Sequence, residues 1–180
     1  MEPSWNAQLQ QLLDREAIRD CIYRFCRGVD RVDEDALRSV YWHDATGRHG
    51  AHQGDAASFI EGVLRNRKGG GRAIHLIGNI LIEWHGDVAA VESYFRTTLN
   101  ARDAGNRPQE TLLAGRYLDR FERRNGEWRI AVRTVVYDWV RHTELKADTD
   151  AEQFGSRQPM GAHKPADALY DLLAQAKSAD

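Results

Sequence analysis

Histidine is the side chain best suited to proton transfer near neutral pH, because its ordinary pKa lies near 6.5. His75 stands at the start of Arg72 to Glu83, an alternating apolar run that indicates a β-strand. We expect its side chain to face inward at the mouth of a cup, with Asn79 further along the same strand. There it could accept a proton from a substrate, whereas its alternative role is purely structural.

A second set of polar side chains lies on a long helix expected from residue 5 to about residue 28. Its apolar residues recur at three- and four-residue steps, as an amphipathic helix requires. Steps of four, three and four residues place the following side chains in one row: Arg19, Tyr23, Cys26 and Asp30. A carboxylate and a phenol beside an apolar stripe either face solvent or line a cavity.

The sequence contains two cysteines, Cys21 and Cys26, five residues apart on the expected first helix. At that spacing their side chains point to different faces, so we predict two free thiols in a reducing compartment and no internal disulfide. Cys26 as a nucleophile is the less favoured interpretation, because a buried thiol is chemically quiet.

Three histidines, His43, His49 and His52, follow in a glycine-containing stretch. Their spacing fits no specific zinc signature, so we predict an exposed loop or a poorly formed strand and no metal. His43 is nearest to the preceding helix and is the one we expect at the mouth of the pocket.

Helices come first in the chain and strands follow. Asp33 is the expected N-cap of a short helix ending at Trp42, and Asp55 that of a helix ending at Arg67. The run Lys68 to Gly71 should be a flexible connection. Four strands are then expected, at 73–84, 87–100, 110–123 and 127–141, followed by a C-terminal helix at 166–176.

This order predicts an α+β fold, in which a curved antiparallel sheet packs on the N-terminal helices and encloses a pocket. On the last strand, strict alternation places Arg133 on the face opposite Ile130 and Val132, and therefore outside. Only a bulge or a half-open sheet would bring Arg133 into the pocket.

The overall composition limits the partners of this chain. The 180 residues suit one domain and carry a net charge of −2, with a pI near 6.4, which argues against nucleic acid as a partner. No apolar run approaches the ~20 residues of a membrane span, and no signal peptide is evident, so we expect a cytoplasmic protein without membrane contact.

Several short stretches together resemble the SnoaL-like branch of the nuclear transport factor 2-like superfamily. They are Ala17 to Asp20, Asp30 to Asp33, Tyr41 to Ala45, His75 to Asn79, Gly115 to Phe121 and Gly126 to Ile130. The resemblance covers roughly residues 8–142 and implies a cone of bent sheet closed by helices. We therefore expect one α+β barrel domain at 1–142 and a tail with a short amphipathic helix at 143–180.

Enzymes of this branch include scytalone dehydratase, hexachlorocyclohexane dehydrochlorinase, bile-acid 7α-dehydratase and diarylpropane lyases, all free of cofactors. The resemblance implies a catalytic pair made of Asp30 and His75, with an arginine at Arg133. A lysine or tyrosine that several members carry is replaced here by Phe25, which has no proton to give. The acid must then come from elsewhere: Tyr23 is the favoured donor, and Tyr41 or an arginine are the alternatives.

From these observations we expect a cofactor-independent lyase, a dehydratase or a carbon–carbon-cleaving eliminase, acting on a small apolar aromatic, diaryl or polycyclic compound. The residues expected to contact this substrate are Tyr41, Phe25, Asn79, Arg116 and His43. The alternatives are an isomerase using the same pair, or a non-catalytic binding or assembly module such as the small subunit of a ring-hydroxylating dioxygenase. Resemblance favours a homotrimer, with a dimer second.

Overall fold

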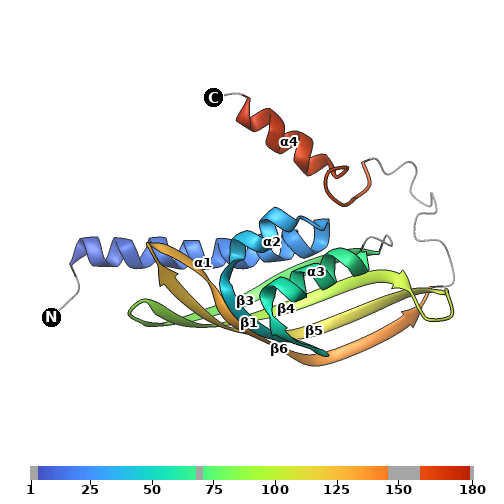
Figure 1. The fold of residues 1–180 in the computed structure, drawn as a ribbon, viewed down its shortest axis with the longest axis horizontal. Helices are drawn as coiled ribbons and strands as arrows, with labels where there is room; N and C mark the ends of the chain where they lie inside the picture. The colour runs from blue at the N-terminus through green and yellow to red at the C-terminus, as the bar shows by residue number, and fades with distance from the viewer. Residues whose placement is uncertain (1–3, 68–70, 146–158, 179–180) are drawn as a thin grey trace.

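The computed structural model describes residues 4–67, 71–145 and 159–178, and the expected connection at residues 68–70 lies outside them. Within the described residues, helices precede the long strands (Figure 1). In chain order the elements are α1 (Trp5–Arg31), α2 (Glu34–Val40), β1 (Tyr41–His49), β2 (His52–Asp55), α3 (Ala56–Arg67), β3 (Arg72–His85), β4 (Val88–Arg102), β5 (Pro108–Arg124), β6 (Glu127–Glu144) and α4 (Ala168–Lys177).

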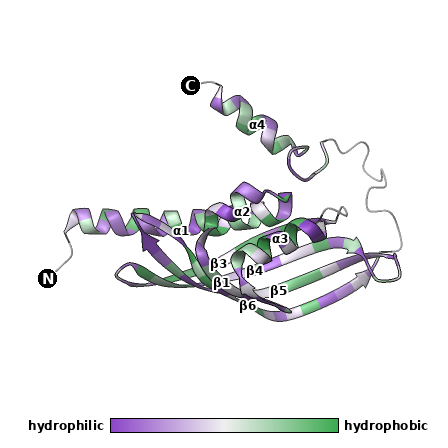
Figure 2. Ribbon diagram, in the orientation of Figure 1, coloured by the Kyte–Doolittle hydropathy of each residue, from purple (hydrophilic) through white to green (hydrophobic). Residues whose placement is uncertain are grey.

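The strands form one curved, open sheet in the order β2-β1-β6-β5-β4-β3, with α1, α2 and α3 over one face (Figure 1). Neighbouring strands are antiparallel except β1 and β6, which run parallel. Apolar and polar residues alternate along the strands, as expected when one face is covered and the other is exposed (Figure 2). The predicted α+β fold is confirmed, with a sheet that does not close.

The stretch from Tyr41 to Asp55 is a β-hairpin, so of the two expectations for this stretch the strand is correct and the loop is wrong, and the expected helix end at Trp42 was wrong. The helix ends at Val40 because Tyr41 is extended, with φ −110°, and pairs with Ile130 of β6. A partner strand from the far end of the chain provides these hydrogen bonds, so local sequence does not reveal them. Gly47 permits the close approach, since a Cβ there would lie 2.9 Å from the carbonyl oxygen of Arg133.

A β-bulge in β6 decides which side chains reach the interior. Phe121 of β5 pairs with Ile130, but the preceding residue Arg120 pairs with Val132, which leaves Ala131 as an extra residue. Strict alternation is therefore broken, and Arg133 is fully buried instead of lying outside. The bulge alternative weighed from the sequence is the one the structure adopts.

The core lies between α1 and the concave face of the sheet. The buried stripe of α1 begins at Ile18 and continues through Phe25 to Asp30, whereas Trp5 and Leu12 nearer the start of the helix are exposed. The predicted amphipathic helix is therefore correct, but its buried residues all lie in its second half. No helix in the described parts of the chain is long and apolar enough to cross a membrane.

The expected helix caps are present. The Asp33 carboxylate accepts from the Ala36 N–H at the start of α2, and the Asp55 carboxylate accepts from the Ser58 N–H at the start of α3. The expected C-terminal helix is α4, which Asp167 caps in the same way and which buries none of its residues.

Candidate active site

Asp30 and His75 meet where the end of α1 crosses the start of β3. Asp30 is the last residue but one of α1, which ends because Val32 adopts a left-handed conformation with φ +54°. Its carboxylate binds His75 twice: one oxygen lies 2.6 Å from Nδ1, and the other accepts the His75 backbone N–H at 2.9 Å. Only 9% of the His75 side chain and 10% of the Asp30 side chain are exposed.

This arrangement gives the imidazole a defined orientation. The carboxylate holds the proton on Nδ1, so Nε2 is the nitrogen available to accept a proton from a substrate. The same carboxylate would stabilise the imidazolium that forms. Because the contact to the backbone N–H fixes the carboxylate itself, the pair is organised before any substrate arrives.

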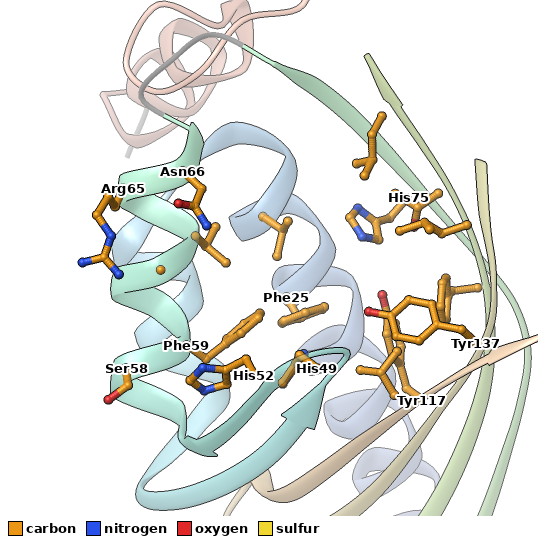
Figure 3. A pocket seen from close by; sticks show the side chains of 18 residues that line it. Phe25, His49, His52, Ser58, Phe59, Arg65, Asn66, His75, Tyr117 and Tyr137 are labelled. Carbon is orange, nitrogen blue, oxygen red and sulfur yellow. The ribbon is translucent and has the colours of Figure 1, made fainter. Parts of the chain in front are cut away.

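His75 lines a cavity of about 430 Å³ between α3, α1 and the sheet (Figure 3). This volume falls in the usual range for small-molecule sites, and apolar and polar residues contribute about equally to the lining. The residues lining it are Phe25, Val29, His49, His52, Ser58, Phe59, Gly62, Val63, Arg65, Asn66, His75, Phe95, Thr97, Leu99, Leu113, Tyr117, Val135 and Tyr137.

Phe25 lies in the middle of the aromatic wall, as expected of a residue that contacts substrate. Its ring centroid is 6.5 Å from that of His75 and also 6.5 Å from that of His49. A flat apolar ligand against Phe25 would therefore have an imidazole near either end.

Three residues with hydroxyl groups on the sheet side of the cavity were not selected by sequence analysis. Tyr117 and Tyr137 lie on the sheet side, together with His75 (Figure 3). Burial raises the pKa of both phenols, most strongly that of Tyr117, so both remain neutral hydrogen-bond donors. Thr97 pairs directly with His75 across β3 and β4, and its buried hydroxyl has no partner among the described residues.

Inward and outward side chains alternate along the strands, and this alternation is the sequence feature that indicates these residues. Tyr117 and Thr97 occupy inward positions, but identifying the inward face requires the register of β4 and β5. Tyr137 follows the bulge in β6, which places it on the same inner face as Ile130, where strict alternation would place it on the outer face. Sequence alone did not locate that bulge.

His49 and His52 are the histidines of the hairpin that reach the cavity, whereas His43 is exposed on β1 and does not line it. The His49 ring stacks on Phe59 at a centroid distance of 3.8 Å. Burial, with Arg133 and His52 adding positive charge nearby, lowers the pKa of His49 to about 3. His49 is therefore a neutral imidazole, and the choice of His43 for the pocket mouth was wrong.

Arg133 is buried behind the cavity wall and is not among the described residues that line it. Its guanidinium forms two hydrogen bonds to the Asp119 carboxylate, at 2.7 and 2.6 Å. It also lies 4.1 Å from the Phe25 ring centroid and 4.3 Å from that of Tyr117. Arg133 therefore packs against two of the rings that line the cavity.

Four other expected residues lie away from the described cavity lining. Tyr23 is 51% exposed and borders a second cleft, which Asp30 and His75 also line. Asn79 is exposed beside an irregularity in β3, and Arg116 pairs with acidic groups on the outer face of the sheet. Tyr41 is buried against Phe25, with a centroid distance of 6.1 Å.

The structure also locates the two thiols. Cys21 and Cys26 are free and buried, as expected. Burial raises the pKa of each to about 12, which argues against a nucleophilic thiolate. In the parts of the chain that the structure describes, no three His, Cys, Asp or Glu side chains come together in a group suited to a metal ion.

Comparison with known proteins agrees with this architecture. The family model for the SnoaL-like domain matches residues 10–134. A search of curated proteins found no significant match. Among solved structures, the hexachlorocyclohexane dehydrochlorinase LinA-type3 of Novosphingobium barchaimii LL02 is 26% identical, with a TM-score of 0.61 over 78% of this chain and 96% of that chain.

Two proteins of Novosphingobium aromaticivorans DSM 12444 share the fold at lower identity. A proposed scytalone dehydratase is 18% identical, with a TM-score of 0.63 over 78% of this chain and 93% of that chain. The β subunit of a proposed aromatic-ring-hydroxylating dioxygenase is 20% identical, with a TM-score of 0.55 over 73% of this chain and 93% of that chain.

Proposed function

This chain belongs to the SnoaL-like domain family, and from its Asp30–His75 pair we propose that it is a cofactor-independent lyase acting on a small, mostly apolar compound. One observation carries the proposal: His75 lines a cavity with an aromatic wall while Asp30 holds its Nδ1. This geometry is the one a general base requires.

In the proposed reaction, His75 Nε2 removes a proton from a carbon of the substrate. The electron pair of the broken C–H bond forms a new double bond, and the bond to the leaving group breaks with its electrons. Asp30 stabilises the imidazolium, which later returns its proton to the leaving group or to solvent. Positioned acid–base catalysis contributes roughly 10²–10⁴-fold, so further stabilisation of charge is required.

Tyr117, Tyr137 and Thr97 are the groups we propose for that task. Their hydroxyls belong to residues on the sheet side of the cavity near His75, and the two phenols are held neutral by burial. A neutral donor can bind the negative charge that develops on a leaving oxygen or halide, or on an enolate. They replace Tyr23 in this role, because Tyr23 is not among the described residues that line this cavity.

The substrate that fits best is a compound with one or two rings. A cavity of about 430 Å³ with an aromatic wall accommodates aromatic, diaryl or small polycyclic molecules. The dehydrochlorinase at 26% identity acts on a halogenated ring, which supports the elimination chemistry. Phe25, which has no proton to donate, argues for a leaving group assisted from the sheet side.

The experiment compares wild-type protein with His75→Ala in assays for elimination product, using hydroxylated diaryl compounds, cyclic β-hydroxy ketones and hexachlorocyclohexane. Turnover by the wild type and a loss of several orders of magnitude in His75→Ala, with an unchanged circular dichroism spectrum, would support the proposal. Equal rates in the two proteins would overturn it.

A further inference from the structure

Residues 159–178, here called the C-terminal segment, lie beyond the region that matches the family model. This segment contacts the rest of the chain beside the Asp30–His75 pair. Figure 1 shows the turn before α4 next to the end of α1 and α2. One set of contacts is made to the end of α1, which carries Asp30, and to the turn after it. The other is made to the residue before β3, the strand that carries His75.

The first set of contacts is to the turn that follows Asp30. Lys164 Nζ lies 2.9 Å from an Asp33 oxygen and 2.8 Å from Asp35, and the Tyr170 hydroxyl donates to the other Asp33 oxygen at 2.9 Å. The Lys164 backbone N–H also donates to the Arg31 carbonyl oxygen at 2.7 Å. Burial disfavours the Asp33 charge, but the hydrogen bonds, led by that from Lys164, hold its pKa below the ordinary value.

The second contact is to the residue that precedes β3. His163 Nε2 lies 3.1 Å from the carbonyl oxygen of Gly71, so the imidazole donates there. Gly71 comes four residues before His75. Arg31 links the two sets of contacts, because its guanidinium also reaches the Ala162 carbonyl oxygen and the Asp167 carboxylate.

The location of the catalytic pair explains why such contacts matter. Asp30 lies in the last turn of a helix, where unsatisfied carbonyl groups make fraying easiest. His75 lies near the start of β3, which is an edge strand of the sheet. A hydrogen bond of 2.6 Å between two element ends requires both ends to be held, and small displacements at a catalytic pair are costly.

We infer that the C-terminal segment is a clasp that holds the end of α1 and the start of β3 together, with Lys164, Tyr170 and His163 as positioning residues for the Asp30–His75 pair. The effect on catalysis rests on the proposed function, whereas the effect on the hydrogen bond does not. The clasp acts at a distance from the cavity and contributes no group to the substrate.

The test uses the full-length chain with the double substitution Lys164→Met and Tyr170→Phe. Proton NMR follows the downfield resonance of the proton between His75 Nδ1 and Asp30, which needs no substrate. We expect this resonance to broaden or disappear, and kcat to fall roughly 10-fold with little change in KM, because only orientation is lost. Lys164→Arg, which keeps the positive charge, should change the resonance and kcat less than the double substitution does.

Lys177→Met, in the last turn of α4, is the matched control and should leave both readouts unchanged. An unchanged resonance in the double variant would overturn the inference, even if its melting temperature fell, because the segment would then be only structural. If the wild type shows no turnover on any compound, the proposed function fails, while the resonance still decides whether the clasp exists.

Discussion

At the scale of single residues, the proposed mechanism depends on the Asp30 carboxylate, which makes two contacts with His75. The sequence identified both residues, because the resemblance placed Asp30 at a helix end and His75 at a strand start. It did not identify the hydroxyls, because Tyr117, Tyr137 and Thr97 become neighbours of His75 only through strand register. The pair could be predicted from short motifs, whereas the groups facing it could not.

Asp30→Asn removes the charge while keeping the shape of the side chain. We expect kcat to fall by ~10²–10⁴, because the amide neither stabilises the imidazolium nor fixes the correct tautomer. Steady-state kinetics would measure the effect. Asp20→Asn is the control, since Asp20 pairs with Arg24 on the exposed side of the same helix. Similar kinetics in both variants would remove Asp30 from the mechanism.

Tyr117→Phe removes one hydroxyl from the cavity without changing the ring that packs on Phe95 at 4.5 Å. If this hydroxyl binds developing negative charge, kcat should fall roughly 10²-fold with little change in KM. Tyr94→Phe, on the outer face of the sheet, is the control. A rise in KM at constant kcat would instead assign Tyr117 to substrate binding.

At the scale of elements, the structure differs from the sequence prediction in two features, the β1–β2 hairpin and the bulge in β6. Periodicity predicted the long strands and the four described helices, because those patterns are local. The hairpin joins the sheet by pairing residues 41–48 with residues 130–134, far apart in sequence, and the bulge is defined by the register of β6 against β5. Those two features bring His49 and Arg133 next to the site.

Arg133→Met should destabilise the fold, because it leaves the Asp119 carboxylate buried without its partner. The expected loss is about 3–5 kcal/mol in the free energy of unfolding, measured by urea denaturation. Adding Asp119→Leu should recover part of this loss, since no unpaired charge remains. Arg116→Met, which breaks a partly exposed pair, should cost less than about 1 kcal/mol. Equal losses for Arg133→Met and Arg116→Met would contradict the buried pair.

His49 should make the protein less stable in acid. Its pKa of about 3 in the folded state lies below the ordinary value of 6.5, so between these values the unfolded chain binds a proton that the folded chain does not. Stability should therefore fall as the pH drops below about 6.5, by at most ~1.4 kcal/mol per pH unit from this group.

His49→Phe, which preserves the stacking on Phe59, should reduce that slope when urea denaturation is measured between pH 4 and 7. His43→Phe changes an exposed histidine on the same strand and should leave the slope as it is. If the two substitutions have the same effect, His49 is not held neutral.

At the scale of the whole molecule, a SnoaL-like fold carries a C-terminal segment that braces the catalytic pair. The sequence predicted the family and the fold class from the order of its elements, and the family match and the solved structures confirm them. It left open whether the last helix is a lid or an oligomer contact. In the structure the segment holding that helix contacts the α1–α2 turn and the start of β3.

The outer face of the sheet carries exposed apolar side chains that are suited to contact between copies of the chain. Leu76, Leu81 and Trp139 are more than half exposed there. We propose that this face supports the homotrimer expected from the family, with a dimer second. Light scattering coupled to size-exclusion chromatography should give about three times the chain mass of 20.5 kDa. A monomeric mass at all concentrations would contradict the proposal.

The measurement that tests the central claim most directly is removal of a carbon-bound proton by His75. A two-ring ketone without a leaving group, such as 2-tetralone, is incubated in D₂O, and loss of its acidic C–H signal is followed by proton NMR. The account predicts exchange well above the spontaneous rate with the wild type and exchange at the spontaneous rate with His75→Ala. Equal exchange rates with the two proteins would contradict it.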